Sequence, residues 1–437
     1  KKYNIEIEET EQTNEQKEEA DVRESLYLVN TFANTYFQEV LQKTDRGKAI
    51  GKGYFLERGF TEKTITKFQL GYSLDEWQAF TDRAIKEGYK LEFLEQTGLT
   101  IVKDTKTFDR FKGRVMFPIH SMSGRVLGFG GRILTNEKKA AKYLNSPESF
   151  VYNKSKVLYG LYFAKQEIAK EDNCFLVEGY TDVIQMHQTG IKNVVSSSGT
   201  ALTPDQIRLI NRLTKNITVL FDGDAAGLRA SLRGIDMILE QGMNVRVCTF
   251  PEGEDPDSFS KTNTLSQLKT YLESQSQDFI QFKASLLANE AANDPIKKAE
   301  TVRDIVNSIS KIPDQIKREI YVRTCSRIMD ISEEVLFSTL AQIFSKEVKE
   351  QSRIEKRRPA SFQVVKNEPS SAKKIDRQFE LERKIIEILL IYGNENETFE
   401  DLILKESEVS GELEMEPVNQ DAKVFEKIYL DLQEDEM

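Results

Sequence analysis

The sequence has 437 residues, of which 30% are charged and 39% are hydrophobic. A chain of this length exceeds one ordinary core and predicts two or three domains with linkers. Its formal net charge of −10, taken alone, speaks against nucleic-acid binding, because phosphate contacts need clustered Lys and Arg. The sequence has no apolar run of membrane-spanning length and no signal pattern, so no membrane partner is expected and a cytoplasmic location is the default.

Cysteine and histidine are too few to support most of the chemistry that depends on them. The three cysteines, Cys174, Cys248 and Cys325, are far apart, which argues against a disulfide framework and against a zinc site. The two histidines, His120 and His187, leave little room for histidine bases. Zinc is therefore not expected in this chain, and carboxylates are the chemical groups that remain plentiful.

The N-terminal part of the chain changes from an acidic segment to a mixed pattern. Residues 1–24 are acidic and poor in apolar side chains, which predicts a solvated linker. From Arg23 onward, apolar residues recur at three- and four-residue steps and predict a packed helix. Residues 108–134 predict β-strands around a Ser-Gly turn. Residues 25–165 are therefore predicted to form a mixed α/β subdomain.

A basic segment lies inside this subdomain. Between Arg110 and Lys156 there are ten basic residues, and Glu137 and Glu148 are the only acidic ones. Such a local excess in an acidic chain is typical of a face that binds an anionic partner. For each basic residue taken singly, the alternative is a solvated surface position.

The second half of the chain predicts a parallel α/β domain followed by helices. Short apolar runs alternate with helical stretches between residues 172 and 250, which predicts a parallel sheet with helices on its faces. Ligands bind beyond the carboxyl ends of strands in such sheets. The predicted regions are a parallel-sheet domain at 166–262, a helical bundle at 263–349, a lysine-rich linker at 350–376 and the start of a truncated C-terminal domain at 377–437.

Six carboxylates follow three of the predicted parallel strands, at the edge where the carboxyl ends of the strands meet. They are Glu178, Asp182, Asp222, Asp224, Asp255 and Asp257. Like charges at close range either bind a hard cation or raise each other's pKa. Mg²⁺ prefers carboxylate oxygens together with substrate phosphates, so Mg²⁺ is the expected cofactor, with Mn²⁺ as a substitute. Two such ions can activate an attacking hydroxyl and neutralise a leaving oxygen.

Other interpretations of these motifs agree less well with the residues. A calcium-binding loop that starts at Asp222 would need an acid at its fifth position and Glu at its twelfth, where Ala226 and Arg233 stand. The glycines of GFGG precede a predicted strand instead of a helix, which disfavours a dinucleotide loop. Ordinary turn residues remain the alternative for any one acidic motif alone, but three such motifs in order favour a metal site.

The acidic motifs resemble a Toprim domain, and the similarity extends upstream to the bacterial DnaG-type DNA primase family. The Toprim-like elements are Leu176–Val183, Ser198–Thr203, Asp222–Gly227 and Gly253–Asp257. The primase-like elements are Arg110–Phe111, Arg114–Ile119, Gly128–Arg132, Lys142–Glu148, Lys154 and Leu158–Leu161. The resemblance covers about residues 25–350 and depends on long, ordered motifs.

The resemblance implies roles for particular residues. Glu178, Asp222 and Asp224 are expected to hold metal or to act next to it, while Asp182, Asp255 and Asp257 complete the acidic site. The residues expected to face nucleotide or template are Arg110, Arg114, Arg132, Lys142, Asn145 and Lys154. Phe129 and Tyr143 are candidates for base stacking, with core packing as the alternative.

The resemblance also implies a reaction and its partners. A 3′-hydroxyl would attack the α-phosphate of a ribonucleoside triphosphate, so that short RNA primers grow on single-stranded DNA. The expected partners are the DNA template, the triphosphates, the RNA–DNA hybrid and a replicative helicase, and a monomer is expected. The family's zinc-binding domain has no counterpart in this sequence, and its helicase-binding domain is expected to be incomplete.

Two alternatives to a primase remain open. One is another Toprim enzyme, such as a nuclease or a topoisomerase, although a topoisomerase needs a catalytic tyrosine in a further domain. The other is a non-catalytic replication scaffold that binds single-stranded DNA and helicase and uses the acids for a structural ion. An assay of template-dependent incorporation separates these possibilities.

Overall fold

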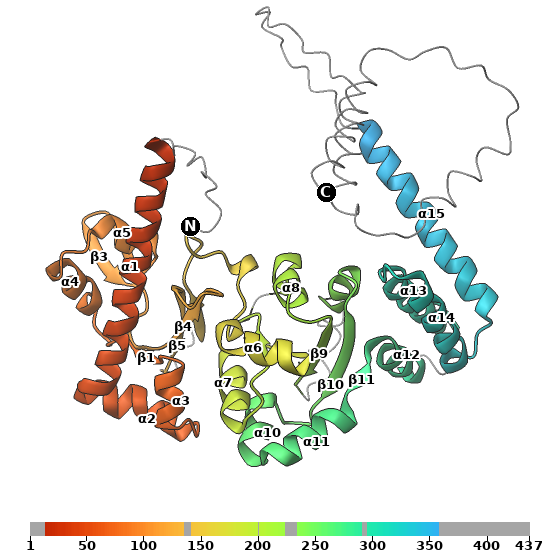
Figure 1. The fold of residues 1–437 in the computed structure, drawn as a ribbon, viewed down its shortest axis with the longest axis horizontal. Helices are drawn as coiled ribbons and strands as arrows, with labels where there is room; N and C mark the ends of the chain where they lie inside the picture. Colours follow the sequence, from red (N-terminus) through yellow and green to blue (C-terminus); the bar gives the residue numbers. More distant parts are fainter. Residues whose placement is uncertain (1–13, 135–140, 200, 223–233, 291–294, 358–437) are drawn as a thin grey trace, which may run out of the picture. The chain divides into compact units, whose positions relative to one another are not determined.

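The computed structural model describes residues 14–134, 141–199, 201–222, 234–290 and 295–357 (Figure 1). The described residues build three successive regions: an N-terminal α/β region, a parallel-sheet region and a helical region. This order agrees with the predicted fold class. Asp224 and the predicted C-terminal region 377–437 lie outside the described residues.

The N-terminal region begins with the long helix α1 (Asn14–Lys43). The predicted packed helix is therefore present, but it starts at Asn14, so part of the segment predicted to be a linker is helical. Glu and Lys in this segment are good helix formers, and Glu24 is paired with Arg125 at 2.6 Å. The apolar stripe, represented by Val29 and Phe37, is buried against the sheet.

The remaining elements of the N-terminal region surround a four-stranded antiparallel sheet in the order β1-β4-β5-β6. Its strands are β1 (Gly71–Tyr72), β4 (Arg114–His120), β5 (Val126–Ile133) and β6 (Tyr143–Asn145). A separate hairpin joins β2 (Thr100–Lys103) to β3 (Lys106–Asp109). The helices are η1 (Gly47–Lys52), α2 (Gly53–Glu57), α3 (Glu62–Lys67), α4 (Ala79–Lys86), α5 (Leu91–Gln96) and η2 (Lys154–Lys156). Strands β4 and β5 confirm the strands predicted at 108–134.

The second region contains a five-stranded sheet in the order β11-β10-β9-β7-β8. Four of its strands are parallel to their neighbours, namely β7 (Cys174–Val177), β8 (Val194–Ser196), β9 (Asn216–Phe221) and β10 (Asn244–Thr249), and β11 (Gln277–Asp278) runs antiparallel at the edge. The surrounding helices include α6 (Leu161–Glu171), α7 (Tyr180–Thr189), α8 (Pro204–Asn211), α10 (Pro256–Thr262) and α11 (Leu265–Gln275). The sheet is the predicted parallel one.

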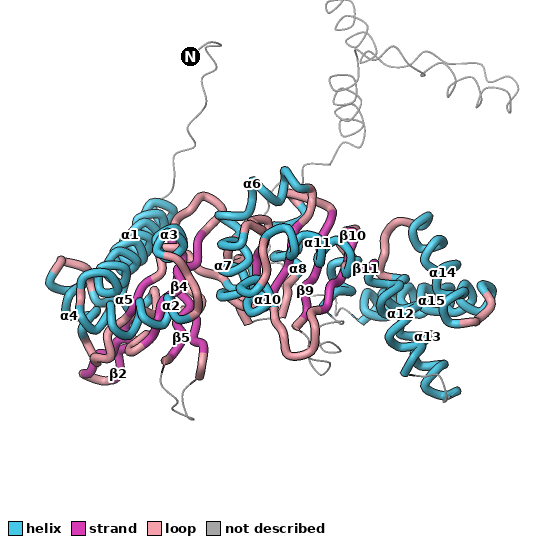
Figure 2. The backbone as a smooth tube through the Cα atoms, turned by 90° about the horizontal axis from the view of Figure 1, so that it is seen from below, coloured by secondary structure: helices cyan, strands magenta, loops and turns pink. Residues whose placement is uncertain are grey.

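The two faces of this sheet belong to different hydrophobic cores, because alternate residues of a strand point to opposite faces. Val177 and Leu220 pack in the core that also contains Phe117 of β4. Leu176 and Val219 pack in the core that extends into the helical region. The parallel sheet is thus the middle layer of the described chain (Figure 2).

The helical region consists of α12 (Phe279–Glu290), α13 (Pro295–Ser310), α14 (Gln315–Met329) and α15 (Glu333–Arg357). Buried side chains such as Val306, Val322 and Leu336 join it to the core of the parallel-sheet region. Helix α15 continues past residue 349, where a linker was predicted. Among the described helices, none is both long enough and apolar enough to cross a membrane.

Candidate metal-dependent active site

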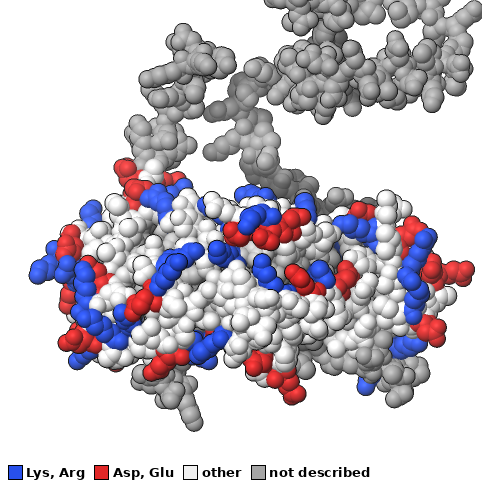
Figure 3. All heavy atoms as spheres, turned by 60° about the horizontal axis from the view of Figure 1, so that its bottom comes forward, with Lys and Arg blue, Asp and Glu red and all other residues white. Residues whose placement is uncertain are grey.

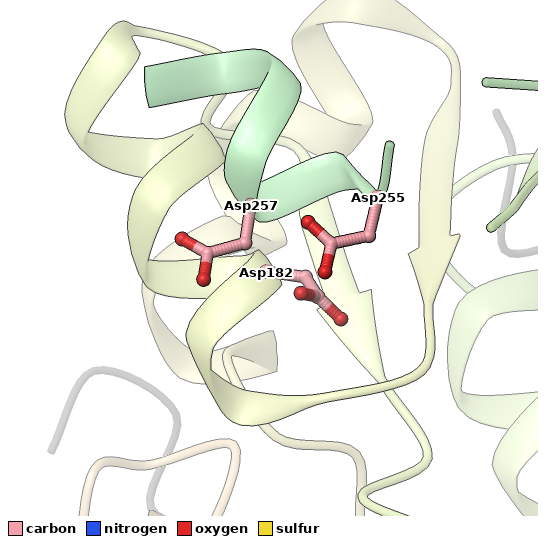
Figure 4. Close-up of side chains that lie close together, drawn as sticks. All are labelled: Asp182, Asp255 and Asp257. Carbon is pink, nitrogen blue, oxygen red and sulfur yellow. The ribbon is translucent and has the colours of Figure 1, made fainter. Parts of the chain in front are cut away.

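The carboxyl edge of the parallel sheet brings most of the predicted acidic residues together. Strands β7, β9 and β10 are adjacent, and Glu178 and Asp222 directly follow β7 and β9. Asp182, in the first turn of α7, meets Asp255 and Asp257 at the start of α10 (Figure 4). Each of these three offers an oxygen atom, and the three oxygens lie within 4.8 Å of one another.

Two of the three clustered carboxylates are fixed by the starts of the helices that carry them. Oδ2 of Asp182 accepts a hydrogen bond of 2.8 Å from the backbone N–H of Gly179, and Oδ1 of Asp255 accepts one of 2.7 Å from the N–H of Ser258. These capping contacts hold both side chains in one orientation. The second oxygen of each accepts no hydrogen bond within the described chain and remains available to a ligand.

The third carboxylate, Asp257, is paired with an arginine instead of with a helix start. Its Oδ2 forms an ion pair with Nη2 of Arg58, which follows α2 in the N-terminal region. Its Oδ1 is buried and has no hydrogen-bond partner in the described chain. Buried polar atoms in folded proteins nearly always have a partner, so an unpartnered carboxylate oxygen beside two others fits a cation site.

The local environment shifts the pKa values of the cluster. Burial raises the pKa of Asp182 to about 7, and the negative charges of Asp257, Asp255 and Asp222 add to the effect. Burial also raises the pKa of Asp257, which Arg58 opposes. Without a cation, therefore, part of the cluster is protonated near neutral pH. A divalent cation favours the ionised forms, and the donor set of carboxylate oxygens suits Mg²⁺ or Mn²⁺.

The other predicted acids have different positions. Glu178 is exposed and lies outside the three-carboxylate cluster, next to a cavity of about 480 Å³ whose lining includes Leu202 and Phe221. Asp222 is close enough for its charge to raise the pKa of Asp182. Their metal-binding roles, like that of Asp224, stay predictions.

The basic side of the site centres on Arg132 in β5. Its guanidinium carbon lies 5.0 Å from the centre of the Tyr54 ring and 5.6 Å from that of Tyr143. Its Nη1 donates to the hydroxyl of Tyr54 and, at 3.4 Å, to that of Tyr143. The Arg58 guanidinium also lies 5.9 Å from the Tyr54 ring. Tyr54 therefore contacts both Arg132 and the arginine that is paired with the acidic cluster.

Three other residues expected to face nucleotide or template make internal contacts. Arg114 is buried, and its Nη1 donates to the carbonyls of Gly131 at 3.2 Å and Ala141 at 3.0 Å. Arg110 donates to the Asn145 carbonyl at 3.4 Å. The Asn145 side chain accepts from the Tyr180 hydroxyl at 2.7 Å and donates to the Ser198 carbonyl at 3.3 Å. These contacts favour structural roles, while ligand contact by the three residues stays a prediction.

The two predicted lysines differ from these internal residues. Lys142 is exposed and Lys154 is half-buried, and neither ammonium group has a hydrogen bond or ion pair within the described chain. On the face drawn in Figure 3, Lys and Arg side chains are interspersed with Asp and Glu and form no single basic patch. Of the two stacking candidates, Phe129 is fully buried in a core, whereas Tyr143 is 38% exposed.

Sequence reasoning missed Arg58 and Tyr54. Both belong to short helical units whose spacing carries no functional signal, and Arg58 meets Asp257 across 199 positions of the chain. Their roles become visible only when the N-terminal region packs against the sheet.

Comparison with known families identifies the class of this architecture. The models that match are "DNA primase catalytic core, N-terminal domain" at residues 36–165, "Toprim-like" at 175–260 and "DnaB-helicase binding domain of primase" at 284–334. A primase-type N-terminal domain in front of a Toprim domain defines the chain as a primase-type catalytic core. The helicase-binding match lies within the helical region, upstream of the segment 377–437 for which that role was predicted.

Individual relatives agree with this class. The chain is 37% identical to the DNA primase of Clostridium acetobutylicum over 323 residues, which are 73% of this chain and 52% of that protein. It is 34% identical to the DNA primase of Halalkalibacterium halodurans over 339 residues, which are 76% of this chain and 55% of that protein. The chain thus spans about half the length of the curated relatives it matches.

Solved structures are similar over nearly their full length. A DNA primase domain from Pseudomonas aeruginosa matches with a TM-score of 0.65 and 32% identity, over 72% of this chain and 99% of that chain. A DnaG primase catalytic domain bound to single-stranded DNA matches with a TM-score of 0.63 and 32% identity, over 70% of this chain and 99% of that chain. The chain belongs to the DnaG-type DNA primase family, as the sequence motifs predicted.

Proposed function

We propose that this chain is the catalytic core of a DNA primase, which polymerises ribonucleoside triphosphates into short RNA primers on single-stranded DNA. The observation that carries the proposal is the cluster of Asp182, Asp255 and Asp257, with oxygens within 4.8 Å, at the carboxyl edge of a Toprim sheet in a member of the primase family. Mg²⁺ is the proposed cofactor, and Mn²⁺ the substitute.

In the proposed reaction a 3′-hydroxyl loses its proton to water, its oxygen forms a bond to the α-phosphorus of a triphosphate, and the bond to pyrophosphate breaks. A cation held by Asp182, Asp255 and Asp257 would supply Lewis-acid neutralisation of the phosphate charge. The protein contributes mainly position. The capping contacts of Asp182 and Asp255 keep two ligands in place before the substrate arrives, so little reorganisation is needed in the transition state.

The proposed partners follow from the basic side of the site. Arg132, Lys142 and Lys154 are the residues proposed to meet triphosphate, template or RNA–DNA hybrid, since phosphate oxygens bind guanidinium groups bidentately and ammonium groups as point charges. The family match at 284–334 supports a replicative helicase as a further partner. We expect the chain to act as a monomer at the bacterial replisome, in the cytoplasm.

A template-dependent incorporation assay tests this function. The chain is incubated with single-stranded DNA, labelled ribonucleotides and Mg²⁺, and the products are separated by length. We expect short RNA products that require template and Mg²⁺ and that the Asp255→Asn variant does not form. Asp205→Asn is the matched control, because Asp205 likewise lies near the start of a helix of this region but pairs with Arg208 at 2.8 Å.

The same assay separates the alternatives. Shortening of the DNA without RNA synthesis would favour a nuclease. Binding of Mg²⁺ and DNA without incorporation would favour a scaffold, and either result would contradict the proposed function.

A further inference from the structure

One arginine from the N-terminal region reaches into the acidic cluster of the sheet edge. Arg58 follows helix α2, and its guanidinium forms an ion pair with Asp257 of α10. The Arg58 side chain is 25% exposed and that of Asp257 only 11%, so solvent screens the pair weakly. Arg58 therefore supplies positive charge at the place where a cation is expected.

In the ion pair between Arg58 and Asp257, each residue keeps one polar atom without a hydrogen bond in the described chain. Oδ1 of Asp257 and Nε of Arg58 are both buried, and neither has a hydrogen-bond partner in the described chain. A fully satisfied guanidinium–carboxylate pair uses two parallel hydrogen bonds. The contact is thus incomplete, and Asp257 still offers an oxygen to the cluster formed with Asp182 and Asp255.

We propose that Arg58 is an exchangeable counter-ion of the acidic cluster, which competes with a divalent cation for Asp257. Without the cation, Arg58 compensates a buried carboxylate that would otherwise be costly to keep ionised. When a cation binds, the two positive groups repel each other across a short, poorly screened distance, so each weakens the binding of the other. This inference rests on the cation site of the proposed function.

Tyr54 determines where the displaced arginine goes. Its ring lies 5.9 Å from the Arg58 guanidinium and 5.0 Å from that of Arg132, and its hydroxyl accepts a hydrogen bond from Arg132. An arginine that leaves Asp257 but keeps its contact with this ring stays next to Arg132. Cation binding therefore places a second guanidinium that is not paired with a carboxylate on the side where an anionic phosphate group is expected. Arg58 is therefore a positioning residue, because it acts on the cation site through its ion pair with Asp257.

Titration with Mn²⁺ alone tests the exchange, without nucleotide or DNA. Isothermal titration calorimetry on the full chain at pH 8 gives the affinity of the wild type, Arg58→Gln and Arg58→Lys. Removal of the competing charge should make Arg58→Gln bind Mn²⁺ roughly tenfold more tightly. Lys keeps the charge but pairs less completely, so Arg58→Lys should bind roughly threefold more tightly.

A matched arginine controls for general effects of charge. Arg125 also pairs with a carboxylate, that of Glu24, and lies 3.7 Å from the centre of the Tyr27 ring, but it does so away from the acidic cluster. Arg125→Gln should therefore leave the Mn²⁺ affinity unchanged. Thermal unfolding gives a second readout: Arg58→Gln without metal should melt below the wild type, and Mn²⁺ should raise its melting temperature by more.

The possible outcomes are distinct. A folded Arg58→Gln protein that binds Mn²⁺ no more tightly than the wild type would overturn the exchange and leave the cation site standing. If Arg58→Gln does not fold, Arg58→Lys decides, and an unchanged affinity overturns the exchange. Absence of Mn²⁺ binding by the wild type would overturn the cation site as well.

Discussion

The sheet edge and the N-terminal region contribute to the candidate site in different ways. The clustered carboxylates of the sheet edge follow strand ends, and helix starts hold Asp182 and Asp255 in place. Arg58 of the N-terminal region pairs directly with Asp257, and Tyr54 lies between Arg58 and Arg132, so this side depends on packing between distant parts of the chain. Asp182 and Asp255 are held by contacts within single helix starts. The arginines are held by packing between the N-terminal region and the parallel-sheet region. Substitutions among the carboxylates should therefore lower activity, whereas substitutions in the N-terminal region should lower stability or ligand affinity.

The largest effect is expected at the sheet edge. Asp222→Ala and Asp224→Ala should each lower primer synthesis by roughly a thousandfold, because removal of one preorganised electrostatic group typically costs 10²–10³ in rate. Circular dichroism should be unchanged, since the loss is expected from the chemistry and not from the fold. Normal synthesis by either variant would remove that residue from the metal site.

The next effect concerns the core between the two regions. Phe117 of β4 is fully buried, and its ring stacks on that of Tyr180 of α7 at 5.1 Å. Phe117→Ala should lower the free energy of unfolding by about 3–5 kcal/mol in a denaturant titration. Phe150→Ala, at a side chain that is 68% exposed, should stay within about 0.5 kcal/mol. Equal losses would contradict the assignment of this core.

Substitution of two arginines of the N-terminal sheet should separate an effect on ligand binding from an effect on stability. Arg132→Ala should raise the KM for nucleotide or weaken DNA binding by roughly tenfold, with a shallower salt dependence of the DNA affinity. Arg114→Ala should lower stability by about 1–3 kcal/mol, because it leaves backbone carbonyls without their donor. The salt dependence of the DNA affinity of Arg114→Ala should match that of the wild type. The reverse pattern would exchange the roles that we assign to these residues.

The smallest effect is a pH dependence at the sheet edge. The pKa of Asp182 is raised to about 7, so a proton competes with the cation below that pH. Mn²⁺ affinity should rise about threefold between pH 6.5 and 7.5, as the ionised fraction of a group with this pKa does. The same raised pKa means that the metal-free fold loses stability as the pH rises through 7. An affinity independent of pH would contradict a buried carboxylate ligand.

The sequence predicts that these carboxylates lie at the carboxyl edge of the sheet, and it does so for a physical reason. Parallel strands and their carboxyl-end residues are local patterns, so the positions of Glu178, Asp222 and Asp255 follow from strand order. The residue roles are less predictable. Arg114 and Asn145 carry the same motif signal as Arg132, yet their side chains are engaged with the backbone and with Tyr180.

The sequence did not predict the features that depend on packing between distant parts of the chain. Arg58 and Tyr54 contribute through contacts that no local spacing encodes. Helix α1 starts earlier, and α15 ends later, than composition suggested, because Glu, Lys and Arg form helices as readily as they form linkers.

Diffraction from a crystal soaked with Mn²⁺ and a ribonucleoside triphosphate tests the central claim most directly. We expect an anomalous peak for a manganese ion bonded to oxygens of Asp182, Asp255 and Asp257, with the triphosphate on the side of Arg132. A manganese ion bound elsewhere, with this cluster free of metal, would contradict it.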